Sequence, residues 1–262
     1  MSQSEIHPQA VVHSTARLAE GVSIGPFAVI GPEVVLGAGV RVGPSVVIEK
    51  GTVIGERCRI FHGASLGGEP QVLGFDPQLP SFLEIGPDTV IREFVTIHRS
   101  MKENGVTRVG AHCLLMAYSH VGHDCEIGDH AVIVNQTGLS GHVVVQPYAF
   151  VSGMVGVHQH VRIGCHAMVG GFTALRKDVL PYSLVEGVPP RLVSTNAVGL
   201  RRRNFPPPVR SALKAALKVI QDPGTNTRQA LERIQSEIEN LEEIRYLVDF
   251  IQQSTRGFIK GV

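Results

Sequence analysis

Aliphatic residues recur at every sixth position along most of the chain. Steps of six from Ile6 to Leu66 meet an aliphatic side chain each time, and the same holds from Val109 to Leu175. If Ile, Val and Leu fill about a quarter of positions, a run of this length arises by chance with odds on the order of one in a million. The chain is therefore built from internal six-residue repeats.

A period of six fits neither a helix nor a simple strand alternation, but it fits short extended segments joined by tight corners. Three such segments close a triangular coil of about 18 residues, and stacked coils form a solenoid with a narrow interior. Glycine often follows the aliphatic, as expected if the corners need unusual backbone angles. Hexapeptide repeats of this kind resemble the left-handed parallel β-helix of acyl- and acetyltransferases. The left hand is implied by that resemblance alone, since parallel crossovers generally favour the right hand.

The composition agrees with a narrow solenoid, because the chain has 29 glycines, no tryptophan and only 5% aromatic residues. Cys58, Cys113 and Cys125 fall on the small inward position of the repeat. We interpret them as core packing, with reactive thiols as the alternative.

Two segments interrupt the repeat, "GGEPQVLGFDPQLPSFLE" after Leu66 and "HRSMKENGVTR" after Ile97. They predict loops at about 67–84 and 98–108. Loops that leave a solenoid commonly carry its binding function, because the coils are committed to stacking. The alternative is a tolerated surface insertion.

Beyond Pro181 the repeat ends and helical patterns begin. "PPPVRSALKAALKVIQD" starts at prolines and shows apolar residues at three- and four-residue spacing, and "TRQALERIQSEIEN" and "LEEIRYLVDFIQQS" are also amphipathic. We therefore predict two domains, an all-β solenoid over residues 1–182 and a linker with a C-terminal α-helical domain over residues 183–262.

Charge and hydropathy exclude several classes of protein. A net charge of +1 offers no basic field for nucleic acid or an anionic membrane. No apolar run approaches the roughly 18 residues of a membrane span, so no integral membrane segment is expected. The start of the chain resembles no secretory signal and the four cysteines form no CxxC pair, which favours a cytoplasmic protein.

The segment "HVGHDCEIGDH" is dense in histidine and acidic residues. His120 and His123 fall on outward or corner positions. His142 and His160 follow Asp124 by one and two coils, so a polar column is expected along one face. Burying such a column without hydrogen-bond partners costs free energy, so the column is better suited to a cleft between subunits where it can bind a ligand. The alternative is that these histidines stack along the surface and have no function.

Two rival classes remain for this column. The γ-type carbonic anhydrases are β-helices that bind zinc with histidines shared across a trimer interface, but their histidine spacing differs from the spacings here. A purely structural or binding solenoid would leave the polar column unexplained. We expect no metal site.

Several segments carry a closer resemblance: "IREFVTIHRS", "SHVGHDCEIGDH", "LSGHV", "VGVHQHVRIG" and "STRGFIK". In this order they resemble the UDP-N-acetylglucosamine O-acyltransferase family, which begins lipid A synthesis, over essentially the whole chain. The resemblance implies transfer of a 3-hydroxyacyl group from acyl carrier protein to the 3-position of a UDP-sugar. It also implies a homotrimer with sites between adjacent subunits and no bound cofactor.

The resemblance also assigns the catalytic roles. His123 matches the family's general base, and an imidazole with its ordinary pKa of about 6.5 suits removal of a hydroxyl proton. Asp124 matches the carboxylate that holds this histidine, and the backbone N–H of Gly141 matches the oxyanion donor. Neighbours on a flat strand point to opposite faces, so the pairing of His123 with Asp124 requires a corner there.

The resemblance also implies the binding roles. It assigns Gly171 as the residue that limits the length of the acyl chain; the alternative is that this glycine only allows the backbone to turn at a corner. Arg202 lies in a basic "RRR" run that can also attract the acidic carrier protein or, alternatively, only start a solvated helix. The expected substrate-binding residues are His120, His142, His158, Gln159, Asn196 and Arg202.

The sequence departs from the family pattern at three positions that touch the nucleotide sugar. Val72 and Gly74 stand where the family usually has aspartate and lysine, and Val198 where its best-known members have glutamate. O-acylation of UDP-N-acetylglucosamine is the favoured reaction, and N-acylation of a 3-amino UDP-sugar is the alternative.

Overall fold

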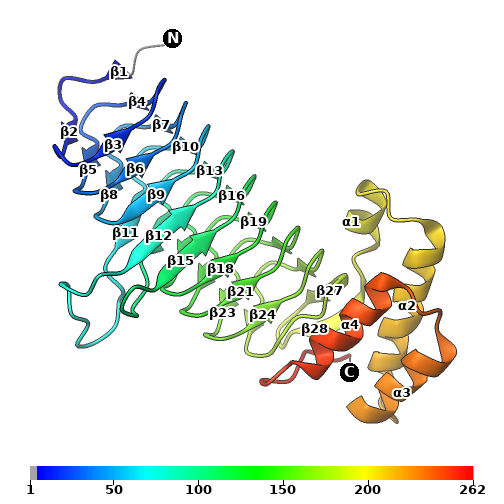
Figure 1. Cartoon of the computed structure of the whole chain (residues 1–262). Helices are drawn as coiled ribbons and strands as arrows, with labels where there is room; N and C mark the ends of the chain where they lie inside the picture. The colour runs from blue at the N-terminus through cyan, green and yellow to red at the C-terminus, as the bar shows by residue number, and fades with distance from the viewer. Residues whose placement is uncertain (1–4, 262) are drawn as a thin grey trace.

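The computed structural model describes residues 5–261, which form an elongated triangular prism followed by a cluster of helices (Figure 1). Each turn of the chain adds one short strand to each of three sheets, so every third strand pairs with the next coil. Pairing between coils is parallel and keeps the aliphatic positions in register, as for Val121 and Leu139. One strand and one corner account for the period of six.

The strands divide among the three faces of the prism. The first sheet contains β1 (Glu5–Ile6), β4 (Ser23–Ile24), β7 (Arg41–Val42), β10 (Arg59–Ile60), β13 (Val90–Ile91), β16 (Leu114–Leu115), β19 (Val132–Ile133), β22 (Phe150–Val151), β25 (Met168–Val169), β27 (Ser183–Glu186) and β28 (Arg191–Thr195). The second sheet contains β2 (Val11–Val12), β5 (Val29–Ile30), β8 (Val47–Ile48), β11 (Ser65–Gly68), β14 (Thr96–His98), β17 (His120–Val121), β20 (Gly138–Leu139), β23 (Gly156–Val157) and β26 (Ala174–Leu175). The third sheet contains β3 (Arg17–Leu18), β6 (Val35–Leu36), β9 (Thr52–Ile54), β12 (Phe82–Ile85), β15 (Val106–Val109), β18 (Glu126–Ile127), β21 (Val144–Val145) and β24 (Arg162–Ile163).

The repeated aliphatic side chains point into the prism, where Ile97 and Leu139 are fully buried. Cys58, Cys113 and Cys125 are buried among them, which confirms their interpretation as core residues. Burial raises the pKa of the Cys125 thiol to about 12, so this thiol stays protonated and unreactive.

The corners correct one expectation. Many take left-handed backbone angles at residues other than glycine, including Asp124 at φ 58° and His142 at φ 60°. The preference for glycine directly after the aliphatic residue is explained by packing between coils. At Gly122 a Cβ atom would lie 2.8 Å from the backbone nitrogen of Gly141 in the next coil, so the close approach of neighbouring coils excludes a side chain.

Two loops leave the prism where the sequence predicted interruptions. The first connects β11 to β12 and projects from the prism, and the second connects β14 to β15 (Figure 1). The coil pattern resumes after each loop, because β12 pairs with both β9 and β15.

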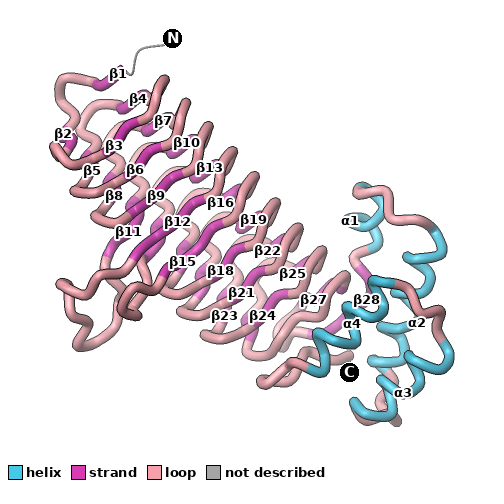
Figure 2. Tube along the Cα trace, in the orientation of Figure 1, coloured by secondary structure: helices cyan, strands magenta, loops and turns pink. Residues whose placement is uncertain are grey.

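The C-terminal part begins with two strands and ends in helices at one end of the prism (Figure 2). Beyond residue 182, β27 extends the first sheet by pairing with β25, and β28 folds back antiparallel to β27. Four helices follow: α1 (Ala197–Arg202), α2 (Pro207–Gln221), α3 (Thr227–Glu237) and α4 (Glu242–Gln252). Their apolar stripes are buried, with Leu213, Ile234 and Leu247 fully so. Among the described residues, no helix has the length and apolar character to cross a membrane.

Candidate active site

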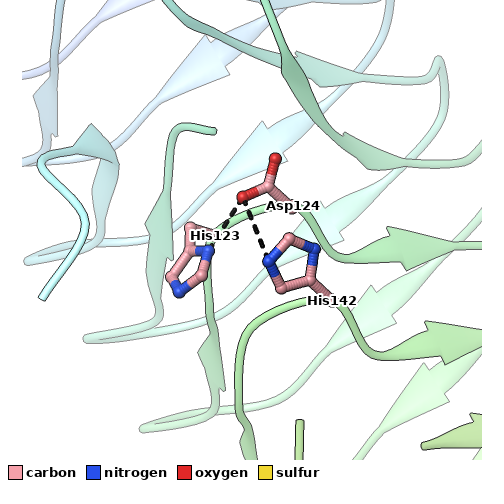
Figure 3. A group of neighbouring side chains, drawn as sticks. All are labelled: His123, Asp124 and His142. Atoms are coloured by element: carbon pink, nitrogen blue, oxygen red, sulfur yellow. Dashed lines mark hydrogen bonds and ion pairs between the residues drawn. The ribbon is translucent and has the colours of Figure 1, made fainter. Parts of the chain in front are cut away.

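His123 and Asp124 lie at the corner between β17 and β18. The left-handed backbone at Asp124 bends the chain, so two adjacent side chains that would diverge on a flat strand turn toward each other. Nδ1 of His123 lies 2.8 Å from Oδ2 of Asp124, and their side chains are only 13% and 7% exposed (Figure 3). The structure therefore has the corner that this pairing requires.

The Asp124 carboxylate receives further hydrogen bonds from the second loop. Ser100 Oγ donates to Oδ1 at 2.5 Å, and the Met101 N–H donates to Oδ2 at 3.2 Å. Burial opposes ionisation, but the hydrogen bonds from Ser100, His123 and Met101 outweigh it and hold the pKa of Asp124 below its usual value. The carboxylate is thus charged at neutral pH and can stabilise a protonated His123.

His142 stands one coil further along the same corner. Its Nε2 atom lies 3.8 Å from Oδ2 of Asp124 (Figure 3). Its ring stacks on His160 with ring centroids 4.6 Å apart, which is the column expected from the spacing. Burial lowers the pKa of His142, although the Asp124 charge acts in the opposite direction. Donor atoms of His123, Asp124 and His142 lie within 4.8 Å of one another, so this cluster could also hold a metal ion.

His120 is fixed by residues that the sequence did not single out. Thr96 Oγ1 lies 2.8 Å from its Nδ1 atom. The His98 ring packs edge-on against the His120 ring, with ring centroids 4.7 Å apart. Burial lowers the pKa of His120 and lowers that of His98 to about 4, so both rings are neutral at pH 7. No spacing rule identifies Thr96 or His98, although Thr96 lies just before the interruption "HRSMKENGVTR" and His98 is its first residue.

An open cavity of about 810 Å³ adjoins these residues along the second sheet. Among the residues expected from the sequence it is lined by His120, His123, Gly141, His158 and Gln159, and Val72 of the first loop lines it as well. A Cβ atom at Gly141 would collide with the His123 ring, so the backbone of Gly141 lies directly beside the imidazole.

Five of the expected residues do not line this cavity: Asp124 and His142 belong to the catalytic corner beside it, and the other three lie elsewhere. Asn196 caps α1, accepting from the Gly199 N–H at 3.0 Å and donating to the His166 carbonyl oxygen at 2.9 Å. Arg202 ends α1, so the basic run closes a short helix and does not begin one. Gly171 is exposed beside Phe172, and it is Phe172 that takes the left-handed corner conformation.

Comparisons with known proteins place this site in context. A family profile described as Udp N-acetylglucosamine O-acyltransferase, Domain 2, matches residues 178–259, and a bacterial transferase hexapeptide profile matches residues 107–141. Among curated relatives, the acyl-[acyl-carrier-protein]–UDP-N-acetylglucosamine O-acyltransferase of Paraburkholderia xenovorans is 42% identical over 98% of this chain and 100% of its own length. That of Thermodesulfovibrio yellowstonii is 37% identical over the same shares. The crystal structure of Francisella novicida UDP-N-acetylglucosamine acyltransferase matches with a TM-score of 0.93 and 39% identity, covering 97% of this chain and 94% of that one.

The fold and the site together define a hexapeptide-repeat transferase. Identity to full-length relatives narrows this class: the chain belongs to the acyl-[acyl-carrier-protein]–UDP-N-acetylglucosamine O-acyltransferase family. The predicted fold class, a left-handed parallel β-helix with a C-terminal helical domain, is confirmed. A zinc enzyme like the γ-carbonic anhydrases and a purely structural solenoid are not favoured.

Proposed function

We propose that this protein moves a 3-hydroxyacyl chain from acyl carrier protein to the 3-hydroxyl of UDP-N-acetylglucosamine, as the first step of lipid A synthesis in the cytoplasm. Relatives that match nearly the whole chain are named for this acyl transfer. The structural observation that carries the proposal is the hydrogen bond between His123 and Asp124 beside an open cavity.

His123 is the general base of this reaction. With Nδ1 bonded to Asp124, its Nε2 atom is left to accept the proton of the sugar hydroxyl. As that proton leaves, the hydroxyl oxygen bonds to the thioester carbonyl carbon. The tetrahedral intermediate then loses the C–S bond, and the proton passes from His123 to the departing thiolate of the carrier protein. Asp124 stabilises the imidazolium between these two steps.

The Gly141 N–H is the oxyanion donor. A preorganised backbone donor stabilises the charge that develops on the carbonyl oxygen. Supporting this role, Gly141 lines the cavity next to the His123 ring, so a carbonyl group beside the base would also lie close to this N–H. His120, His142, His158 and Gln159 bind the sugar, the diphosphate or the pantetheine region.

A homotrimer completes the site. Asn196 and Arg202 contact the nucleotide in the family pattern. Because they stand at the two ends of α1, outside the cavity of their own subunit, they act from a neighbouring subunit. An exposed apolar row along the corner between the first and second sheets supports such a contact. This row consists of Phe94, Tyr118, Met154 and Phe172, with the polar Gln136 between Tyr118 and Met154.

The decisive experiment is mass spectrometry of the product formed from 3-hydroxyacyl carrier protein and either of two acceptors, UDP-N-acetylglucosamine and its 3-amino analogue. We expect an O-acylated UDP-N-acetylglucosamine. Acylation of the 3-amino sugar alone would refute the assigned acceptor, and release of free fatty acid without sugar acylation would refute the transfer. Size measurement by light scattering tests the trimer independently.

A further inference from the structure

The second loop, which joins β14 to β15, and the strand β15 that follows it contact the catalytic corner at three points. Ser100 Oγ donates to Oδ1 of Asp124, the Met101 N–H donates to Oδ2, and Oγ1 of Thr107 accepts the Asp124 N–H at 2.8 Å. The start of the loop and the strand after it thus bond to one residue. This pattern suggests a task more specific than that of a surface insertion.

Ser100 bonds to Oδ1 of the carboxylate, whereas Met101 and His123 both bond to Oδ2. Rotation of an aspartate carboxyl about its last bond is soft, so the group needs external contacts to hold one orientation. With Oδ1 bonded to Ser100, Oδ2 faces Nδ1 of His123 at 2.8 Å.

The serine is itself held in place. Ser100 is fully buried, and its hydroxyl oxygen accepts the Lys102 N–H at 3.0 Å, which directs the hydroxyl proton toward Asp124. Gly105 closes the loop over it, and a Cβ atom at Gly105 would collide with the Ser100 hydroxyl. The loop therefore encloses this hydroxyl and leaves it little freedom to move.

We propose that Ser100 is a positioning residue for the acyl transfer, fixing the Asp124 carboxylate so that it aligns and stabilises His123. The inference rests on the proposed function, in which His123 is the base. Ser100 itself touches neither substrate nor the reacting atoms and acts only through Asp124.

The test compares Ser100→Ala with Ser81→Ala, a matched control because Ser81 is also buried and its hydroxyl has no partner among the described residues. A hydrogen bond to a charged group is commonly worth a tenfold change or more. We expect Ser100→Ala to lower kcat at least tenfold with the KM for UDP-N-acetylglucosamine within twofold of normal, and Ser81→Ala to change neither. Gly105→Ala, which displaces the hydroxyl, should lower kcat in the same way.

A double-mutant cycle separates positioning from a general structural effect. In an Asp124→Asn background, Ser100→Ala should lower kcat by no more than twofold, because the residue through which it acts has been changed. The proposal is overturned if Ser100→Ala leaves kcat of the wild type unchanged, or if it costs the same factor in both backgrounds.

Failure of the proposed function would be recognised separately. If the proposed function is wrong, the wild-type protein will acylate neither UDP-sugar. The positioning role can still be tested in that case, because the downfield proton resonance of the His123–Asp124 hydrogen bond is measured by NMR without turnover. A shift of this resonance in Ser100→Ala supports the positioning role, and an unchanged resonance refutes it.

Discussion

Replacing Gly171 by methionine should shift the acyl-chain preference of the enzyme toward chains several carbons shorter. Gly171 is exposed, and a Cβ atom there approaches only the Gly153 carbonyl oxygen, at 3.3 Å. A side chain at this position therefore extends away from the prism after a small adjustment. The family resemblance implies that the acyl tail lies in a groove between neighbouring β-helices. In the proposed trimer the new side chain would enter the far end of that groove.

The size of the effect follows from the buried methylenes. Each one contributes about 0.8 kcal/mol, so excluding two carbons from the groove costs about 1.6 kcal/mol, or roughly 15-fold in selectivity. Excluding four carbons costs about 3.2 kcal/mol, or roughly 200-fold in selectivity. Glycine leaves the end of the groove open, so the wild-type enzyme should prefer the longer chains.

The assay measures kcat/KM against a series of carrier-linked 3-hydroxyacyl chains that differ by two carbons. Gly224→Met is the matched control, because Gly224 is a distant glycine in the helical domain where a Cβ atom meets only Asp222 at ordinary contact distance. Activity on the shortest chains should persist in Gly171→Met. An unchanged preference in a properly assembled variant would show that the groove ends elsewhere, and Gly171 would lose its assigned role.

Three further predictions concern the base, the first loop and pH. His123→Ala should lower kcat by about 10²-fold, the usual contribution of a general base, with UDP-N-acetylglucosamine affinity by calorimetry unchanged; near-normal turnover would remove His123 from the mechanism. Val72→Asp should tighten UDP-N-acetylglucosamine binding, because Val72 lines the cavity where the family usually has a carboxylate, and an unaltered dissociation constant would mean that the loop does not reach the sugar. Burial lowers the pKa of His98 to about 4, so the unfolded chain binds more protons than the folded one between about pH 6.5 and pH 4. The free energy of unfolding should therefore fall as pH drops through this window, by roughly 2 kcal/mol from this residue. His98→Gln should flatten the dependence of Tm on pH. An equally steep dependence in the variant would contradict the lowered pKa assigned to His98.

The periodicity predicts most of the fold, because a side chain in a stacked coil has only two directions, inward or outward. The six-residue spacing alone placed Val121 and Leu139 in the core and His142 one coil after Asp124. The two loops and the three longer helices also follow from local sequence. The short helix α1 was not predicted, because its six residues are held mainly by the Asn196 cap and the burial of Leu200.

The contacts within the site were less accessible to prediction. Ser100 and Asp124 are 24 residues apart, which is not a multiple of one coil, because the loop adds residues between them. Thr96 meets His120 across the same insertion. A repeat pattern gives only the place of each residue within its own coil. It therefore does not predict which residue of an inserted loop contacts a given corner.

The stacking of equivalent corner residues limits how such a site can change during evolution. Along one corner, functional groups stand at separations fixed by the spacing of neighbouring strands, about 4.8 Å, as the His142 and His160 rings illustrate. A substitution there exchanges the chemistry at one fixed point and leaves the distances to its neighbours nearly unchanged. An insertion of a single residue within a coil would instead turn the following inward side chains toward solvent. New specificities should therefore arise by exchange of corner residues, by gain or loss of whole coils, and by lengthening of the loops that leave the prism.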